Sequence, residues 1–117
     1  MEDEEIKDTC DKLNNNYSNG NIITREEKVD ILKYWADKYR DVKTFIETGT
    51  HDGYTLLALK DVFKELYSVE LDKDRYLKSI ERYAKENSPR NIEIVHASSL
   101  WFLPRILKEI NTPCFFW

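Results

Sequence analysis

Two segments of the sequence place glycine, hydroxyl and acidic residues at a spacing suited to binding a nucleoside. Residues 47–53 read ETGTHDG, and an acidic residue, Glu70, follows further along the chain. Gly49 has no Cβ, so the backbone there can turn sharply or approach a ligand closely. The carboxylate of Glu70 offers two acceptor oxygens, which match the neighbouring hydroxyls of a ribose. Together the two segments indicate a ligand that contains adenosine.

The glycine spacing excludes two other classes of nucleotide site. Gly49 and Gly53 give the pattern G-x-x-x-G. A dinucleotide-binding turn has G-x-G-x-x-G, and a phosphate-binding P-loop has G-x-x-x-x-G-K-[ST]. Two simpler interpretations stay open: the glycine segment can be a plain strand-to-helix turn, and Glu70 can be a surface acid beside the helix that Asp72 begins.

Strand and helix patterns alternate around these segments. Short β-branched and aromatic runs predict strands at 42–47, 66–70, 92–95 and 114–117. A capping box at Thr24 predicts a first helix, and residues 54–63 predict a second that is apolar almost all round. A third helix begins at the capping Asp72 and runs to about Lys85, and Pro104 is expected in the first turn of a fourth.

Apolar stripes at helical spacing predict the buried face of each amphipathic helix. They comprise Val29, Leu32, Trp35, Ala36 and Tyr39 in the first helix, Tyr76, Leu77, Ile80, Tyr83 and Ala84 in the third, and Leu103, Ile106, Leu107 and Ile110 in the fourth.

This alternation predicts an α/β fold: a Rossmann-like, doubly wound parallel sheet with helices on both faces. We expect residues 1–21 to form a polar, loosely attached N-terminal extension with a short helix, and 22–117 to form a partial Rossmann-like domain. The last strand is apolar and ends at Trp117. Because parallel strands are normally covered and flanked, we expect the domain to be truncated after this fourth strand.

Three segments of the sequence resemble the first three motifs of the class I S-adenosylmethionine (SAM)-dependent methyltransferases. They are FIETGTHDGYT at 45–55, YSVELD at 67–72 and IEIVHASS at 92–99. The similarity runs from about residue 42 to 117, which corresponds to the first half of the family's catalytic domain. Within that family the sequence is most similar to small-molecule and sugar O-methyltransferase-like proteins.

The resemblance implies SAM as cofactor and assigns a set of residues to it. Residues that would surround its methionine part are Glu47, Thr48, Gly49 and Thr50, with Gly53 opening the packing beneath them. Glu70 would bind the ribose hydroxyls, Leu71 would lie against the adenine, and Ser98 would face the adenine amino group.

Two departures from the family pattern affect this assignment. Ala97-Ser98 stands where Gly-Asp is commoner, so a neutral hydroxyl replaces a charged acceptor whose hydrogen bond would be roughly twice as strong. The second departure is that the sequence ends at Trp117, in the fourth strand, whereas the segments that bind the methyl acceptor in the family follow that strand. We therefore name no catalytic residue and no metal ligand, and we expect the isolated chain to be inactive. We interpret His51 as a solvated loop histidine, with a contact to the substrate or to a carboxylate as the alternative. We interpret His96 as a hydrogen-bonded strand-end histidine, with a role as a base as the alternative.

Composition limits the partners and the compartment. The 117 residues carry a net charge of −4 without a basic block, which argues against nucleic-acid binding. No apolar run is long enough for a membrane span, the N-terminus is acidic, and Cys10 and Cys114 form no metal or redox motif. These features predict a cytoplasmic protein with reduced cysteines.

Two functions remain open from the sequence. The first is SAM-dependent methyl transfer to a small-molecule or sugar hydroxyl. The second is a non-catalytic α/β module that forms a homo-oligomer or binds another protein through the exposed edge of the fourth strand.

Overall fold

A parallel sheet of four strands, in the order β3-β2-β1-β4, forms the centre of the computed structural model, which describes residues 23–117. Its strands are β1 (Thr44–Thr48), β2 (Glu65–Glu70), β3 (Ile92–His96) and β4 (Cys114–Phe116). Its helices are α2 (Arg25–Lys38), α3 (Tyr54–Ala58), α4 (Lys73–Lys85) and α5 (Ser99–Glu109). The predicted α/β fold with a Rossmann-like parallel sheet is confirmed. The predicted N-terminal extension and Cys10 lie outside the described residues.

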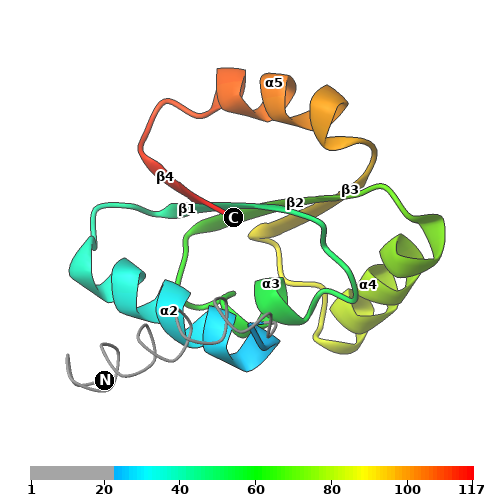
Figure 1. The fold of residues 1–117 in the computed structure, drawn as a ribbon, viewed down its shortest axis with the longest axis horizontal. Helices are drawn as coiled ribbons and strands as arrows, with labels where there is room; N and C mark the ends of the chain where they lie inside the picture. Colours follow the sequence, from blue (N-terminus) through cyan, green and yellow to red (C-terminus); the bar gives the residue numbers. More distant parts are fainter. Residues whose placement is uncertain (1–22) are drawn as a thin grey trace.

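The helices cover both faces of the sheet, as predicted. Helices α2, α3 and α4 lie on one face, and α5 alone lies on the other (Figure 1). The first face holds the larger core, which joins side chains of α2, β1, β2, β3 and the α3 region: Val29, Leu32, Phe45, Leu56, Leu57, Leu59, Phe63, Leu66 and Ile92. The second core is smaller and consists of Ile46, Val69, Phe102 and Ile106.

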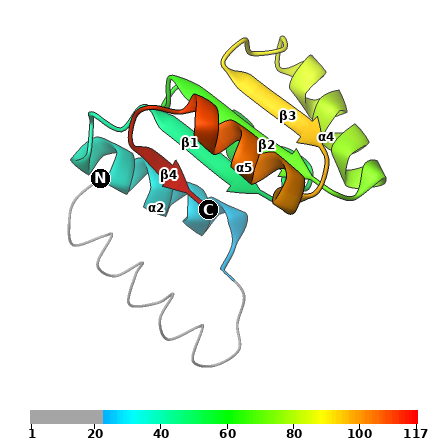
Figure 2. The same ribbon diagram turned by 90° about the horizontal axis from the view of Figure 1, so that it is seen from above.

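The register of the strands brings their carboxyl ends to one edge of the sheet. Thr48 of β1 pairs with Val69 of β2, and Glu70 pairs with His96 of β3. All four strands run in the same direction, as the view from above shows (Figure 2). In open α/β sheets this edge is where ligands bind.

Helix α3 is shorter than the predicted 54–63. It ends at Ala58, the N–H groups of the next residues form turns, and backbone groups further along bind other elements. The Asn91 side-chain amide donates to the carbonyls of Lys60 (2.7 Å) and Phe63 (3.2 Å), and the Lys64 N–H donates to the carbonyl of Lys43 (2.8 Å). The apolar side chains that follow the helix stay buried in turns.

The prediction that Pro104 lies in the first turn of its helix is wrong. Helix α5 begins at Ser99, where the Ser98 hydroxyl accepts from the Trp101 N–H (3.2 Å), and this places Pro104 in the helix interior. Proline has no N–H to offer the carbonyl four residues earlier, that of Leu100. Leu100 is 90% exposed, so solvent can take the place of the missing bond.

The predicted buried face of α4 is also partly wrong. Leu77 and Ala84 are exposed, whereas Ser79, which the apolar pattern passed over, is fully buried. The cause is Gly53, at the N-terminus of α3, which lies against Ser79. A Cβ built on Gly53 would come within 3.3 Å of the Ser79 Cβ. Gly53 therefore allows α3 to approach α4 closely.

One aromatic and one aliphatic residue that the apolar stripes predicted to be buried, Tyr39 and Leu107, are half exposed. Tyr39 lies just beyond the end of α2, where its ring stacks on Trp35 at 5.9 Å, and Leu107 lies on the outer side of α5. Neither contributes to the two cores.

We predict that Gly53→Ala lowers the free energy of unfolding by about 2 kcal/mol, more than Gly49→Ala does. Both glycines have a left-handed φ, of +82° and +80°, so both variants incur backbone strain of roughly 1–2 kcal/mol. Only the Gly53 variant also presses a methyl group on the helix at Ser79, whereas a Cβ at Gly49 meets the side chain of His51 alone. Urea denaturation of both variants measures the difference. Equal losses would contradict the role of close α3–α4 packing.

Candidate functional site

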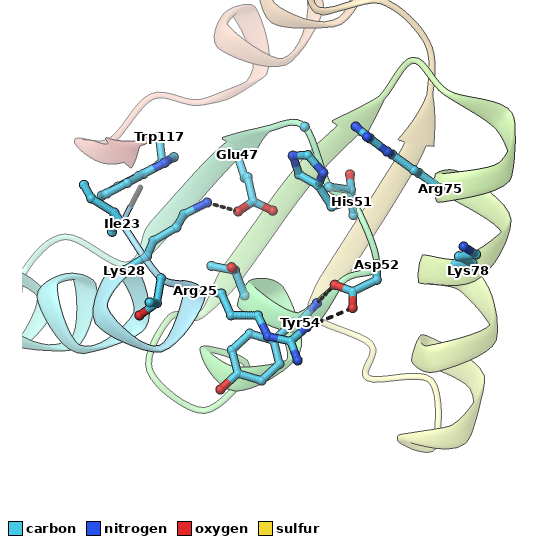
Figure 3. A pocket seen from close by; sticks show the side chains of 14 residues that line it. Ile23, Arg25, Lys28, Glu47, His51, Asp52, Tyr54, Arg75, Lys78 and Trp117 are labelled. Carbon is cyan, nitrogen blue, oxygen red and sulfur yellow. Dashed lines mark hydrogen bonds and ion pairs between the residues drawn. The ribbon is translucent and has the colours of Figure 1, made fainter. Parts of the chain in front are cut away.

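A pocket of about 880 Å³ opens beside the carboxyl end of β1. Its walls come from the start of α2, the loop after β1, the start of α3, one side of α4, and the residue after β4 (Figure 3). The lining residues are Ile23, Thr24, Arg25, Lys28, Glu47, Gly49, Thr50, His51, Asp52, Tyr54, Thr55, Arg75, Lys78 and Trp117. Small-molecule and cofactor pockets usually measure about 300–1,000 Å³, so this one can hold a ligand the size of a nucleoside.

The buried carboxylate of Glu47 lies at the end of β1 and pairs with Lys28 of α2. Only 1% of the Glu47 side chain is exposed, and the Lys28 Nζ lies 2.5 Å from its Oε2 (Figure 3). The other oxygen, Oε1, lies 3.4 Å from the hydroxyl of Ser68, which in turn contacts Thr50 at 2.5 Å. Burial raises the pKa of Glu47 above its usual value of 4.5, although the ammonium of Lys28 opposes this shift.

Asp52 connects three elements that surround the pocket. Its Oδ2 lies 3.0 Å from the guanidinium of Arg25 on α2 and 3.0 Å from that of Arg82 on α4. Its Oδ1 accepts from the Tyr54 N–H (3.2 Å) at the start of α3. The Arg25 guanidinium also lies over the Tyr54 ring, 4.3 Å from its centroid. The loop after β1 is thus held to both flanking helices.

The loop after β1 turns through left-handed backbone positions and contacts Glu70. Gly49 has φ +80° and His51 has φ +54°, and the Gly49 N–H donates to the carbonyl of Val69 (2.9 Å). The His51 N–H donates to Glu70 Oε1 (2.8 Å), and the Asp72 N–H donates to Oε2 (3.0 Å). Glu70 is only 5% exposed. The loop and the carboxylate are therefore brought together, but the carboxylate points into the loop and does not line the pocket.

The remaining residues assigned from the sequence lie around the edges of this site. Thr48 pairs with the end of the chain, its N–H donating to the carbonyl of Trp117 (2.9 Å). Leu71 follows β2 and is 71% exposed, and Ser98 is the N-cap of α5. Of the assigned set, Glu47, Gly49 and Thr50 line the pocket, whereas Thr48, Gly53, Glu70, Leu71 and Ser98 do not.

The two histidines occupy different settings. His51 lines the pocket with an exposed side chain, and His96 stacks on Tyr76 with 5.1 Å between the ring centroids. The Nε2 of His96 lies 3.2 Å from the carbonyl of Leu71, which agrees with its interpretation as a hydrogen-bonded strand-end histidine.

Sequence reasoning missed the charged side chains that reach the pocket from the helices. Arg25 and Lys28 come from the first turn of α2, and Arg75 and Lys78 come from α4. The spacing of Arg75 and Lys78, one turn apart on one helix, is a signal that they share a face. Nothing near Lys28 in the sequence pointed to Glu47, because that contact depends on how α2 packs against β1.

Residues 23–117 contain neither a cluster of metal ligands nor a membrane-spanning helix. Within residues 23–117, no three His, Cys, Asp or Glu side chains gather closely enough to hold a metal ion. Over the same residues, every helix is too short or too polar to cross a bilayer.

Comparison with known proteins gave matches among solved structures alone. No family model and no curated protein matches the sequence. An O-methyltransferase from Bacillus cereus in complex with S-adenosylhomocysteine (SAH) matches with a TM-score of 0.64 and 15% identity, over 97% of this chain and 52% of that one. The O-methyltransferase TomG from Streptomyces achromogenes, involved in tomaymycin synthesis and solved with SAM, matches with a TM-score of 0.60 and 18% identity, over 90% of this chain and 48% of that one.

A third structure belongs to the same group. It is a putative caffeoyl-CoA O-methyltransferase from Staphylococcus aureus, with a TM-score of 0.64 and 16% identity over 86% of this chain and 47% of that one. The chain thus has the Rossmann-like fold of the class I SAM-dependent methyltransferases and is structurally similar to them. It spans about half the length of these three structures.

We predict that Glu47→Gln changes how stability depends on pH. Because the pKa of Glu47 is raised in the folded chain, the native state binds more protons than the unfolded state from about pH 4.5 up to the native pKa. The free energy of unfolding of the unmodified chain should therefore fall, relative to that of Glu47→Gln, as pH rises through this window. Urea denaturation of both proteins between pH 4 and 8 measures this difference in the free energy of unfolding. A relative rise over the same window would contradict the raised pKa.

Proposed function

We propose that this chain binds SAM in the pocket at the carboxyl end of β1. The observation that carries the proposal is the loop after β1, which combines a left-handed Gly49 with the pocket-lining carboxylate of Glu47. A glycine there lets backbone N–H groups approach a ligand, and the carboxylate can accept from the ammonium of the methionine part. The fold supports the proposal, since structures that share it were solved with SAM or SAH.

The nucleoside part of the cofactor extends, in this proposal, from the loop toward Glu70. A carboxylate has about four lone-pair sites, and the His51 and Asp72 N–H groups use two of them. The other two are available to the ribose hydroxyls. Because Glu70 is only 5% exposed, the loop at His51 has to shift when the ribose enters. Leu71, which is exposed, and Ser98 then lie on the adenine side.

The reaction we propose for the whole enzyme is methyl transfer to a small-molecule or sugar hydroxyl. Bound SAM supplies a methyl group activated on a sulfonium. The residues of this chain bind and orient the cofactor: Glu47 holds the ammonium, and the Asp52 contacts with Arg25 and Arg82 hold the loop in place. Alignment of the acceptor and removal of its proton are also required. We assign no residue of this chain to those two tasks.

We predict that Glu70→Gln weakens SAH binding by roughly tenfold or more. The substitution keeps the shape of the side chain but removes the charge, and a hydrogen bond to a charged group contributes about 1.5–3 kcal/mol. Isothermal titration calorimetry on the 117-residue chain measures the affinity. Glu65→Gln is the matched control, because Glu65 begins the same strand and is exposed outside the pocket. Unchanged SAH affinity in Glu70→Gln would remove the ribose assignment.

A specific observation supports a second candidate function, self-association through β4. Among residues 23–117 this strand pairs with β1 alone, and its Phe116 is 54% exposed. Three apolar residues of α5, namely Leu100, Trp101 and Leu107, are also exposed. An unpaired strand edge with apolar side chains favours pairing with another strand.

We predict that the mass of the chain in solution rises toward that of a dimer with increasing concentration and that Phe116→Lys shifts it to monomer. A charged side chain on an edge strand opposes edge-to-edge pairing. Size-exclusion chromatography with light scattering over a range of concentrations gives the mass, and Lys108→Glu, at an exposed position of α5, serves as a control for surface charge. A monomeric mass for the unmodified chain at every concentration would rule out this function.

A further inference from the structure

The ion pair between Lys28 and Glu47 presents both of its charges to the pocket. Both residues line it, and the exposed fraction of the side chain is 15% for Lys28 and 1% for Glu47. The Lys28 ammonium also lies 4.9 Å from the centroid of the Trp117 ring, at a distance suited to a cation–π contact. Lys28 is thus held inside the pocket between a carboxylate and an aromatic ring, as Figure 3 shows.

A ligand with an ammonium and a carboxylate on one carbon is the chemical complement of this pair. Its ammonium can donate to Glu47 while its carboxylate accepts from Lys28, so that one ion pair is exchanged for two. Neither buried charge is left without a partner, which matters because an unpaired buried charge is strongly destabilising. The amino-acid end of SAM is such a zwitterion.

The other charges around the pocket are less suited to this carboxylate. Arg25 is engaged with Asp52 and lies over the Tyr54 ring. Arg75 and Lys78 lie on α4, on the far side of the His51 loop from Glu47 (Figure 3). The ligand carboxylate shares a carbon with the ammonium that Glu47 would bind. A side-chain cation that pairs with this carboxylate therefore has to lie next to Glu47. Lys28 lies there.

We propose that Lys28 is the residue that recognises the carboxylate of the amino-acid part of SAM, with Glu47 binding the ammonium of the same group. This inference rests on the proposed function, since it assumes that SAM occupies the pocket. It adds a specificity determinant: ligands that lack the carboxylate lose the contact with Lys28. In the ligand-free chain the two side chains satisfy each other.

The test compares SAM with decarboxylated SAM, which keeps the sulfonium and the ammonium. Calorimetry is carried out on the unmodified chain, on Lys28→Met, and on Lys33→Met, a control at an exposed position of α2 outside this pocket. We expect Lys28→Met to weaken SAM binding by about tenfold or more and to leave binding of decarboxylated SAM unchanged or stronger. Lys33→Met should bind both ligands as the unmodified chain does.

A double variant controls for the unpaired charge that Lys28→Met leaves buried. Lys28→Met leaves the buried Glu47 without its partner, so Lys28→Met/Glu47→Gln, which removes both charges, is measured as well. We expect it to lose most of the preference for SAM over decarboxylated SAM. Circular dichroism checks that both variants retain the fold of the unmodified chain.

The outcomes separate this inference from the function on which it rests. If the unmodified chain binds neither ligand, the proposed function fails and the inference with it. If the unmodified chain binds SAM but Lys28→Met weakens both ligands equally, Lys28 has a structural role and the inference alone is overturned. Tighter binding of SAM by Lys28→Met would also overturn it, because Lys28 would then compete with the ligand ammonium for Glu47.

Discussion

The buried carboxylate of Glu47 is the constraint on which the site depends. A charge at the end of a central strand is costly to bury and needs a compensating partner. Lys28 provides it from α2, at 2.5 Å, and so joins the first turn of that helix to the end of β1. The start of α2 and the loop after β1 then form two walls of one pocket. The same pair that holds the two elements together also lines the pocket with one carboxylate and one ammonium.

The polar groups of the loop after β1 are also paired with groups of neighbouring elements. Left-handed conformations at Gly49 and His51 bring a backbone N–H onto Glu70, and Asp52 connects the loop to two arginines on different helices. Within residues 23–117, every buried side-chain nitrogen and oxygen has a hydrogen-bond partner in the ligand-free chain. Binding of SAM as we propose it would require the Lys28–Glu47 pair to open and the loop at His51 to move so that the ribose can reach Glu70.

Much of the fold could be predicted from the sequence, because the signals were local. The capping residues Thr24 and Asp72 begin their helices as predicted, and the β-branched runs form the strands to within one or two residues. Predictions failed where long-range contacts prevail. Asn91 and Lys43 bind the backbone where α3 would have continued, and Gly53 brings Ser79, not an apolar residue, to the buried face of α4.

The residues of the candidate site that belong to one continuous segment could be predicted from the sequence. Those brought together by the packing of distant elements could not. Glu47, Gly49 and Thr50 follow from a strand-to-helix loop and do line the pocket. Lys28 is separated from Glu47 by most of α2 and carries no motif. The hydrogen bonds that turn Glu70 into the loop depend on the φ angle of His51, which sequence patterns do not reveal.

A crystal structure of the chain with SAH tests the central claim most directly. We predict that the ligand lies along the carboxyl edge of the sheet, with its amino-acid end between Lys28 and Glu47 and its ribose at Glu70. A ligand bound elsewhere, or a Lys28–Glu47 pair left unchanged at a saturating ligand concentration, would contradict it.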